Sequence, residues 1–126
     1  MNIIKYLLTS VALALAITAA AKPILTIDPA KHNFGNIREN GGSVTAEFTI
    51  TNTGDEPLII KDAQASCGCT KPTYPKAPIR PGESAVLKVT YNPMGRPGEF
   101  EKTITVRSNA KKNKTTVRIT GTVIPD

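Results

Sequence analysis

The chain has 126 residues, a formal net charge of +6 at pH 7 and 40% hydrophobic residues. Its 16 basic side chains are interleaved with ten acidic ones along the whole chain, which argues against a nucleic-acid-binding protein. Only 5% of the residues are aromatic and none is tryptophan, which argues against a stacking platform for carbohydrates.

The N-terminal segment has the pattern of a secretory signal peptide. Lys5 supplies a positive charge, an apolar run follows over residues 6–17, and alanines occupy positions 19–21. The apolar run is shorter than the roughly 20 residues that span a bilayer. We therefore expect a signal peptide over residues 1–21, cleaved before Lys22, and a periplasmic or secreted protein with no stable membrane span. The mature chain, residues 22–126, has the length of one domain.

The mature chain predicts β-strands rather than helices. Apolar and polar residues alternate with a period of two over residues 44–51, 85–92 and 116–121. Further strands are expected around Phe34, over 58–60 and over 100–107. Half-buried strands of this kind need a second layer to cover their apolar face.

Turn-forming residues separate these strands. They occur at 40–42, 52–55, 81–83, 92–98 and 108–113. About seven strands at regular spacing predict an all-β, immunoglobulin-like sandwich over residues 22–126. The proline-rich stretch 72–81 is expected to form a rigid crossover between the sheets, with a polyproline docking segment as the alternative. Lys111, Lys112 and Lys114 are expected at an exposed hairpin tip, with an anion-binding patch as the alternative.

The pair Cys67 and Cys69 holds the only two thiols and is the most reactive group in the chain. Residues two apart in an extended strand lie roughly 6.6 Å apart at Cα, which is near the limit for a disulfide. Gly68 allows the backbone to tighten into a turn, and an oxidising compartment favours pairing. Such a bridge would be strained and readily exchanged.

Four roles for this pair remain open. The first is a local disulfide that fixes the shape of its loop. The second is a thiol–disulfide exchange site, although the Cys-x-x-Cys spacing at a helix N-terminus is missing. The third is soft-metal binding, with Cu(I) or Zn(II) as the metals that thiolates suit, and with copper as the metal in the redox or metal-handling alternative. It would need ligands from a partner or a second copy because His32 and Met94 are the only other candidates. The fourth is a bridge between chains.

An enzyme is not expected. Nucleophilic catalysis by either cysteine would need a positioned base, and only His32 could serve. His32 precedes the cysteines by several strands and is better explained as a surface or edge residue. No paired carboxylates, phosphate-binding loop or metal motif is present, so no cofactor is expected.

Several segments together resemble a known family. They are NFGNI at 33–37, FTITNTG at 48–54, PLII at 57–60, SCGCT at 66–70, PIRPG at 78–82, KTITV at 102–106 and ITG at 119–121. In order and spacing they resemble the exported bacterial domain of unknown function 1573, which is similar to the immunoglobulin-like domains of hydin and the major sperm protein. Tyr74 stands where many members have tryptophan. The resemblance implies the sandwich fold and export from a Gram-negative cell, and it implies no enzyme activity.

The leading functional hypothesis is therefore an exported, non-enzymatic binding or scaffolding domain with an unidentified protein partner. The alternative is thiol redox or soft-metal handling at the Cys67–Cys69 dithiol. Partner contact is expected on the loops at 67–80 and 92–98. The candidate contact residues within the first loop are Thr70, Lys71, Tyr74, Lys76 and Arg80.

Overall fold

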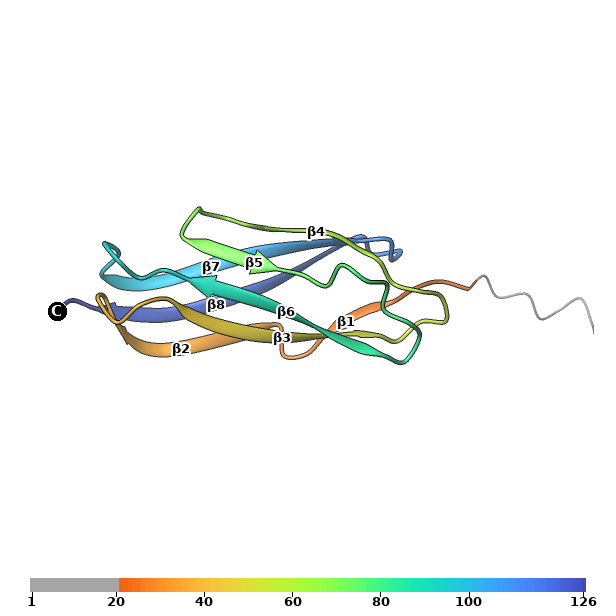
Figure 1. The fold of residues 1–126 in the computed structure, drawn as a ribbon, viewed down its shortest axis with the longest axis horizontal. Coiled ribbons are helices and arrows are strands. Elements are labelled where there is room, and N and C mark those ends of the chain that lie inside the picture. Colours follow the sequence, from red (N-terminus) through yellow and green to blue (C-terminus); the bar gives the residue numbers. More distant parts are fainter. Residues whose placement is uncertain (1–20) are drawn as a thin grey trace, which may run out of the picture.

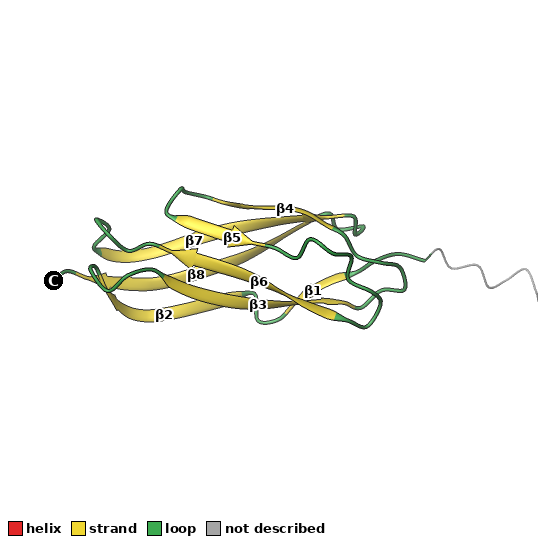
Figure 2. Ribbon diagram, viewed as in Figure 1, coloured by secondary structure: helices red, strands yellow, loops and turns green. Residues whose placement is uncertain are grey.

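The computed structural model describes residues 21–126, so the predicted signal peptide lies outside the described residues except for its last position. Eight strands make up the regular structure: β1 (Leu25–Ile27), β2 (Lys31–Arg38), β3 (Val44–Asn52), β4 (Ile60–Ala65), β5 (Thr70–Thr73), β6 (Ser84–Tyr91), β7 (Gly98–Ser108) and β8 (Lys114–Ile124). Figure 2 shows strands and loops only. Within residues 21–126 no helix is long and apolar enough to cross a membrane.

The strands form two four-stranded sheets that enclose one core. One sheet has the order β1-β3-β6-β5 and the other the order β2-β8-β7-β4. Neighbouring strands are antiparallel except β2 and β8, which run parallel. The sandwich is elongated, with the C-terminus and the β2–β3 and β6–β7 loops at one end (Figure 1). The start of the described chain and the β7–β8 hairpin lie at the other end. The predicted all-β sandwich is confirmed.

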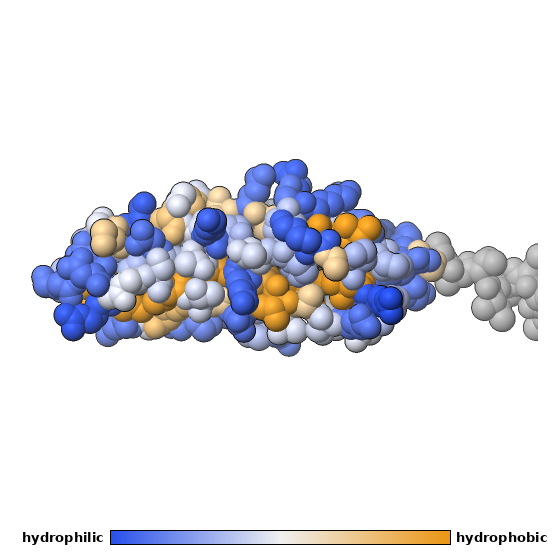
Figure 3. All heavy atoms as spheres, viewed as in Figure 1, coloured by the Kyte–Doolittle hydropathy of each residue, from blue (hydrophilic) through white to orange (hydrophobic). Residues whose placement is uncertain are grey.

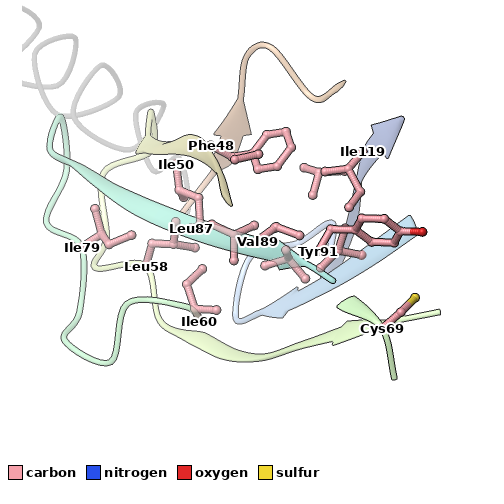
Figure 4. Close-up of a cluster of buried hydrophobic side chains, with 14 of the residues drawn as sticks. Phe48, Ile50, Leu58, Ile60, Cys69, Ile79, Leu87, Val89, Tyr91 and Ile119 are labelled. Atoms are coloured by element: carbon pink, nitrogen blue, oxygen red, sulfur yellow. The ribbon is translucent and has the colours of Figure 1, made fainter. Parts of the chain in front are cut away.

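The period-two pattern identifies the core correctly. The buried hydrophobic residues come from alternate positions of both sheets and from a few loop positions. They are Ala46, Phe48, Ile50, Leu58, Ile60, Cys69, Ile79, Leu87, Val89, Tyr91, Ile104, Val106, Ala110, Val117, Ile119 and Val123. Figure 4 shows the aliphatic members packed together and Cys69 at the margin of the cluster. Most of the intervening positions of these strands carry threonine or charged side chains, and Val86 is an exposed exception on β6.

Two details of the strand prediction differ from the structure. The structure has eight strands rather than about seven, because the short strands β1 and β5 give almost no periodic signal over three and four residues. Residues 58–60 do not form a strand. Leu58 makes a single bridge to Ile79, and β4 begins only at Ile60. A short run of large aliphatic residues indicates burial, but it does not show whether neighbouring residues pair along a strand.

In this part of the chain, the crossing from one sheet to the other lies earlier than predicted. β4 belongs to one sheet and β5 to the other, so residues 66–69 make the crossing. The proline-rich stretch instead connects β5 to β6, which are neighbours in one sheet, and the prediction of a crossover at 72–81 is wrong. Proline at 72 sits inside an edge strand, where a missing N–H is tolerated, so it does not mark the end of the sheet.

Asn52 joins four segments of the chain although its side chain is completely buried. Its Oδ1 accepts hydrogen bonds from the backbone N–H groups of Ile24, at 3.3 Å, and Gly54, at 3.0 Å. Its Nδ2 donates to the carbonyl oxygens of Glu56, at 2.7 Å, and Ile79, at 2.9 Å. All four hydrogen bonds join the buried amide to buried or part-buried backbone groups, so its polar atoms are satisfied, which is the condition for placing a polar side chain in a core.

The N-terminal segment lies directly against the turn that follows Asn52. The N–H of Thr53 donates to Ile24 at 3.0 Å and the N–H of Asp55 donates to Lys22 at 3.1 Å. A Cβ at Gly54 would collide with the backbone of Lys22 and Ile24, so only glycine allows this approach. The segment at residues 22–24 is therefore fixed at the end of the sandwich that also bears the β7–β8 hairpin.

Replacing Asn52 with alanine should lower the free energy of unfolding by about 3 to 4 kcal/mol, because four hydrogen bonds to buried and part-buried backbone groups are lost together. Asn109→Ala is the matched control, since Asn109 also bonds two backbone groups, at Ile59 and Pro57, but at an exposed site. There water replaces the amide, and a loss of about 1 kcal/mol is expected. Urea denaturation measures both, and equal losses would contradict the role given to Asn52.

Candidate functional site

Residues 66–69 cross from one sheet to the other and contain the cysteine pair. The structure joins Cys67 and Cys69 by a disulfide, with 5.4 Å between their Cα atoms. This separation is shorter than that of an extended strand because the chain turns at Gly68. Cys69 is 7% exposed and belongs to the core, whereas Cys67 is half-buried and Gly68 is exposed. The bridge therefore connects the outside of the crossover to the core.

Backbone hydrogen bonds fix this crossover on both sides. The N–H of Ser66 donates to Thr103 of β7 at 3.0 Å, and the N–H of Asn92 donates to Cys69 at 3.0 Å. The Oγ1 of Thr70 lies 3.5 Å from the sulfur of Cys69 and 3.8 Å from that of Cys67. The crossover is consequently tied to β7 and to the loop that follows β6.

The β6–β7 loop presents an exposed methionine on an ordered backbone. Asn92 accepts a hydrogen bond from the N–H of Met94 at 3.1 Å, and Pro93 accepts one from the N–H of Arg96 at 3.1 Å. The N–H of Gly95 donates to the carboxylate of Glu39, on the β2–β3 loop, at 3.1 Å. Pro93 is buried, whereas Met94 is 64% exposed, the largest value among the large hydrophobic residues of the described chain that count as exposed.

A charged contact fastens the C-terminal residue beside these loops. Asp126 accepts hydrogen bonds from Nε of Arg38 at 3.0 Å, from Nη2 of Arg38 at 2.8 Å and from the N–H of Asn40 at 2.8 Å. The Arg38 hydrogen bond, followed by the Asn40 N–H, holds the pKa of the Asp126 carboxyl below its usual value. We call the surface formed by residues 39–43, 66–69, 92–97 and 125–126 the cystine end.

An aromatic pair supports the cystine end from inside. The rings of Tyr91 and Phe100 stack with their centroids 4.1 Å apart and their planes 12° apart. A Cβ at Gly121 would come within 2.8 Å of the Phe100 ring, so glycine at that position makes room for the stack. Burial raises the pKa of the Tyr91 hydroxyl, and the nearby positive charge of Arg96 opposes that shift. The β6–β7 loop, which lies between these two residues in the chain, is therefore supported on both sides by packed side chains.

The structure does not gather the five predicted contact residues into one patch. Thr70 is 5% exposed and Lys71 is exposed on β5, next to the cystine. Lys76 places its Nζ 3.3 Å from the centroid of the Tyr74 ring, in the β5–β6 loop. Arg80 lies in the turn before β6, at the opposite end of that strand from the partner of Thr70. An eight-residue strand spans roughly 24 Å, so Thr70 and Arg80 belong to different ends of the molecule.

His32 lies far from the cysteines. It is on β2, one edge of its sheet, with β8 and β7 between it and β4, the strand that leads into the cystine. Three interstrand steps correspond to roughly 14 Å. His32 instead packs edge-on against Phe34, with 4.6 Å between ring centroids. Within residues 21–126 no group of three or more His, Cys, Asp or Glu side chains is placed to hold a metal ion.

Two four-stranded sheets, between which the chain switches at every connection except β5–β6 and β7–β8, define an immunoglobulin-like, PapD-like sandwich. The chain belongs to the family described as protein of unknown function (DUF1573), whose profile matches residues 25–123. The resemblance drawn from the sequence segments is thereby confirmed. No curated protein sequence matches the chain significantly.

Solved structures share the fold at low sequence identity. A protein of unknown function from Porphyromonas gingivalis W83 aligns with a TM-score of 0.70 and 17% identity over 85% of this chain, which spans 50% of that protein. The seventh PapD-like domain of human CEP192 aligns with a TM-score of 0.68 and 11% identity, covering 88% of this chain and 92% of that one. WR4, a Caenorhabditis elegans member of the MSP family, gives 0.51 and 12% identity, covering 79% and 96%.

Removing the disulfide should destabilise the domain modestly. The bridge closes a loop of three residues, for which chain entropy predicts a loss of about 1 to 2 kcal/mol in the Cys67→Ala/Cys69→Ala variant. Wild-type protein in excess reductant should lose a similar amount, whereas the variant should be unaffected by reductant. Urea denaturation with and without reductant measures this. A variant as stable as the wild type would contradict a structural role for the bridge.

The Arg38–Asp126 contact should depend on pH. Because the pKa of Asp126 is lowered on folding, the contact stabilises above the ordinary aspartate pKa and is lost as the pH falls through the lowered value. NMR titration of the Asp126 carboxyl carbon should give a higher midpoint in Arg38→Gln than in the wild type. Arg118→Gln, which removes the exposed Arg118–Glu101 pair, should leave the midpoint unchanged.

Proposed function

We propose that the protein is an exported, non-enzymatic binding or scaffolding domain that contacts a protein partner through the cystine end. The single observation that favours this surface is the exposed Met94 on a loop whose backbone is hydrogen bonded to both neighbouring loops. An apolar anchor on a rigid support loses little conformational freedom on binding, which is where interface energy concentrates.

The end loops of the sandwich suit this role better than the edge of β5. In an antiparallel pair, the backbone groups of alternate residues point toward the partner strand and away from it. The Asn92–Cys69 hydrogen bond shows that Cys69 points toward β6, so the backbone groups of Thr70 and Pro72 point away, to the free edge of the sheet. The N–H of Thr70 is already bonded to Cys67, and Pro72 has no N–H. The free edge of β5 therefore offers no donors to an added strand, a common protection against edge pairing.

Export and the lack of catalysis rest on the sequence pattern and the geometry together. The N-terminal 21 residues match a signal peptide, and a cystine suits an oxidising compartment. The distance of His32 from the cysteines leaves them without the base that nucleophilic catalysis needs. The family is described as one of unknown function, so membership in it supplies no enzyme activity to propose.

The rival role, thiol redox or soft-metal handling, would use the half-buried Cys67 at the same end of the molecule. It predicts that mild thiol reagents open the bridge in the folded state, or that the reduced protein retains copper in stoichiometric amount. The binding role predicts a bridge that reacts only after denaturation. Intact-mass measurement of alkylated protein under native and denaturing conditions separates the two.

A photocrosslinking residue at position 94 should capture a discrete partner in the native bacterium. The control is the same residue at position 86, since Val86 is 42% exposed but lies on the outer face of β6, away from the cystine end. Adducts at 94 and not at 86 would support the proposed surface. The partner so identified should bind Met94→Asp about tenfold more weakly or worse than the wild type. Equal adducts at both positions, or none at 94, would refute the assignment.

A further inference from the structure

The end of the sandwich opposite the cystine end combines exposed lysines with exposed aliphatic side chains. The β7–β8 hairpin carries Lys111 and Lys112 at its tip and Lys114 at the start of β8, all exposed. None of the three takes part in a salt bridge within residues 21–126. Their charge is therefore available to an external anion. We call this surface, with residues 22–25 and Ile59, the hairpin end.

An apolar hollow lies directly beside these lysines. It has a volume of about 500 Å³ and is lined by Pro23, Ile24, Leu25, Ala110, Lys111 and Lys112. Ile24 is 51% exposed, and Ile59, next to the hairpin, is 45% exposed. Figure 3 shows hydrophobic surface near the end at which the described chain begins, among mainly hydrophilic residues. Isolated exposed aliphatic residues are ordinary, but here two of them adjoin a basic tip.

Hydrogen bonds hold the apolar and basic parts together. Thr53 fixes Ile24 through a backbone bond of 3.0 Å, and Asn109 exchanges hydrogen bonds with Ile59, accepting from its N–H at 2.8 Å and donating its own N–H at 3.1 Å. Acidic groups on neighbouring elements are Asp55, which accepts a hydrogen bond from the N–H of Lys22 at 2.8 Å, Glu56 on the same β3–β4 loop, and Asp62 on β4, which pairs with Arg107. Asp55 and Asp62 thus already have partners, and the apolar and basic parts of the hairpin end are held in a preformed arrangement.

We infer that the hairpin end docks on the surface of a bilayer that contains anionic lipids. Lysines around a small aliphatic surface match the two attractions that hold proteins at a lipid interface, electrostatic attraction and shallow apolar burial. The chain also enters the domain at this end, directly after the predicted leader, so export itself would bring this surface to a membrane. This attachment is peripheral and differs from a membrane span. It does not rest on the proposed partner contact, which uses the other end.

Vesicle co-sedimentation of the mature domain tests the inference. Residues 22–126 hold all eight strands and every buried residue of the described core, so this segment can be produced as a folded unit. We expect binding to vesicles of phosphatidylethanolamine and phosphatidylglycerol, weakened by salt, and no binding to phosphatidylcholine vesicles. At about fivefold per lysine, Lys111→Glu/Lys112→Glu should weaken binding by roughly 25-fold or more.

Matched variants separate a local surface from net charge and from general apolarity. Lys31→Glu/Lys71→Glu changes the net charge equally at two exposed lysines on β2 and β5 and should retain most of the binding. Ile24→Ser should weaken binding, whereas Ile124→Ser, at a 41% exposed residue of the opposite end, should not. Circular dichroism confirms that each variant is folded. Equal losses in the two charge variants, equal losses in the two serine variants, or no binding to the anionic vesicles would each overturn the inference.

Discussion

The fold depends on one buried amide. Asn52 ends β3, yet its side chain reaches backbone groups of the N-terminal segment, of the β3–β4 turn and of the β5–β6 loop. Its own carbonyl and N–H bond to Gly82 and Glu83 at 2.8 and 3.0 Å. Backbone groups of these loops, which would otherwise lack a partner near the core, are hydrogen bonded to Asn52. The arrangement supports β1, which is only three residues long: besides its ladder with β3, the segment that leads into it is held by Asn52 and lies against Gly54.

The disulfide plays the corresponding role at the other end of the sandwich. A four-residue crossover between sheets is short, and its backbone must leave one ladder and join another within that length. The bridge between Cys67 and Cys69 narrows the turn to 5.4 Å at Cα, while the hydrogen bond from Asn92 attaches it to the next loop. The Asn52 side chain thus holds the loops at one end of the sandwich, and the disulfide holds the crossover at the other. The aliphatic core between them is packed from ordinary alternating strand residues.

The sequence predicted the strands, which have a repeating pattern, and missed the roles of single residues such as Asn52 and Pro72. Alternation over 44–51 and 85–92 identified buried faces because every second residue reports the same environment. Asn52 gave no such signal, since an asparagine before Thr-Gly has the composition of an exposed turn. Its burial follows only from the position of Ile79, 27 residues later in the chain. Pro72 misled for a related reason, because proline marks a loop in sequence but also fits a strand edge.

The candidate site was predicted in part. The cysteines and residues 92–98 lie together, but Arg80 does not lie with them. β5 leads the chain away from the cystine toward the other end of β6, and the sequence does not reveal that direction. Thr70 lies near the disulfide as expected from the sequence, yet it is buried, since its position in β5 turns its side chain toward the sulfurs rather than to solvent. Met94 is an exposed large hydrophobic residue of this loop, at 64%, a property that depends on the fold of the loop and that the sequence alone did not predict.

The two proposed surfaces lie at opposite ends of one long strand. β7 has eleven residues and runs from the loop that bears Met94 to the hairpin that bears Lys111, a distance of roughly 34 Å. Sites so far apart, with no shared side chains, are expected to bind independently. A sandwich whose sheets share one close-packed core transmits little motion between its ends, so it separates the two contacts by a fixed length. Taken together, the two proposals describe a spacer that holds a partner at a set height above a lipid surface, and the rigidity supplied by Asn52 and by the cystine is what that proposed role requires.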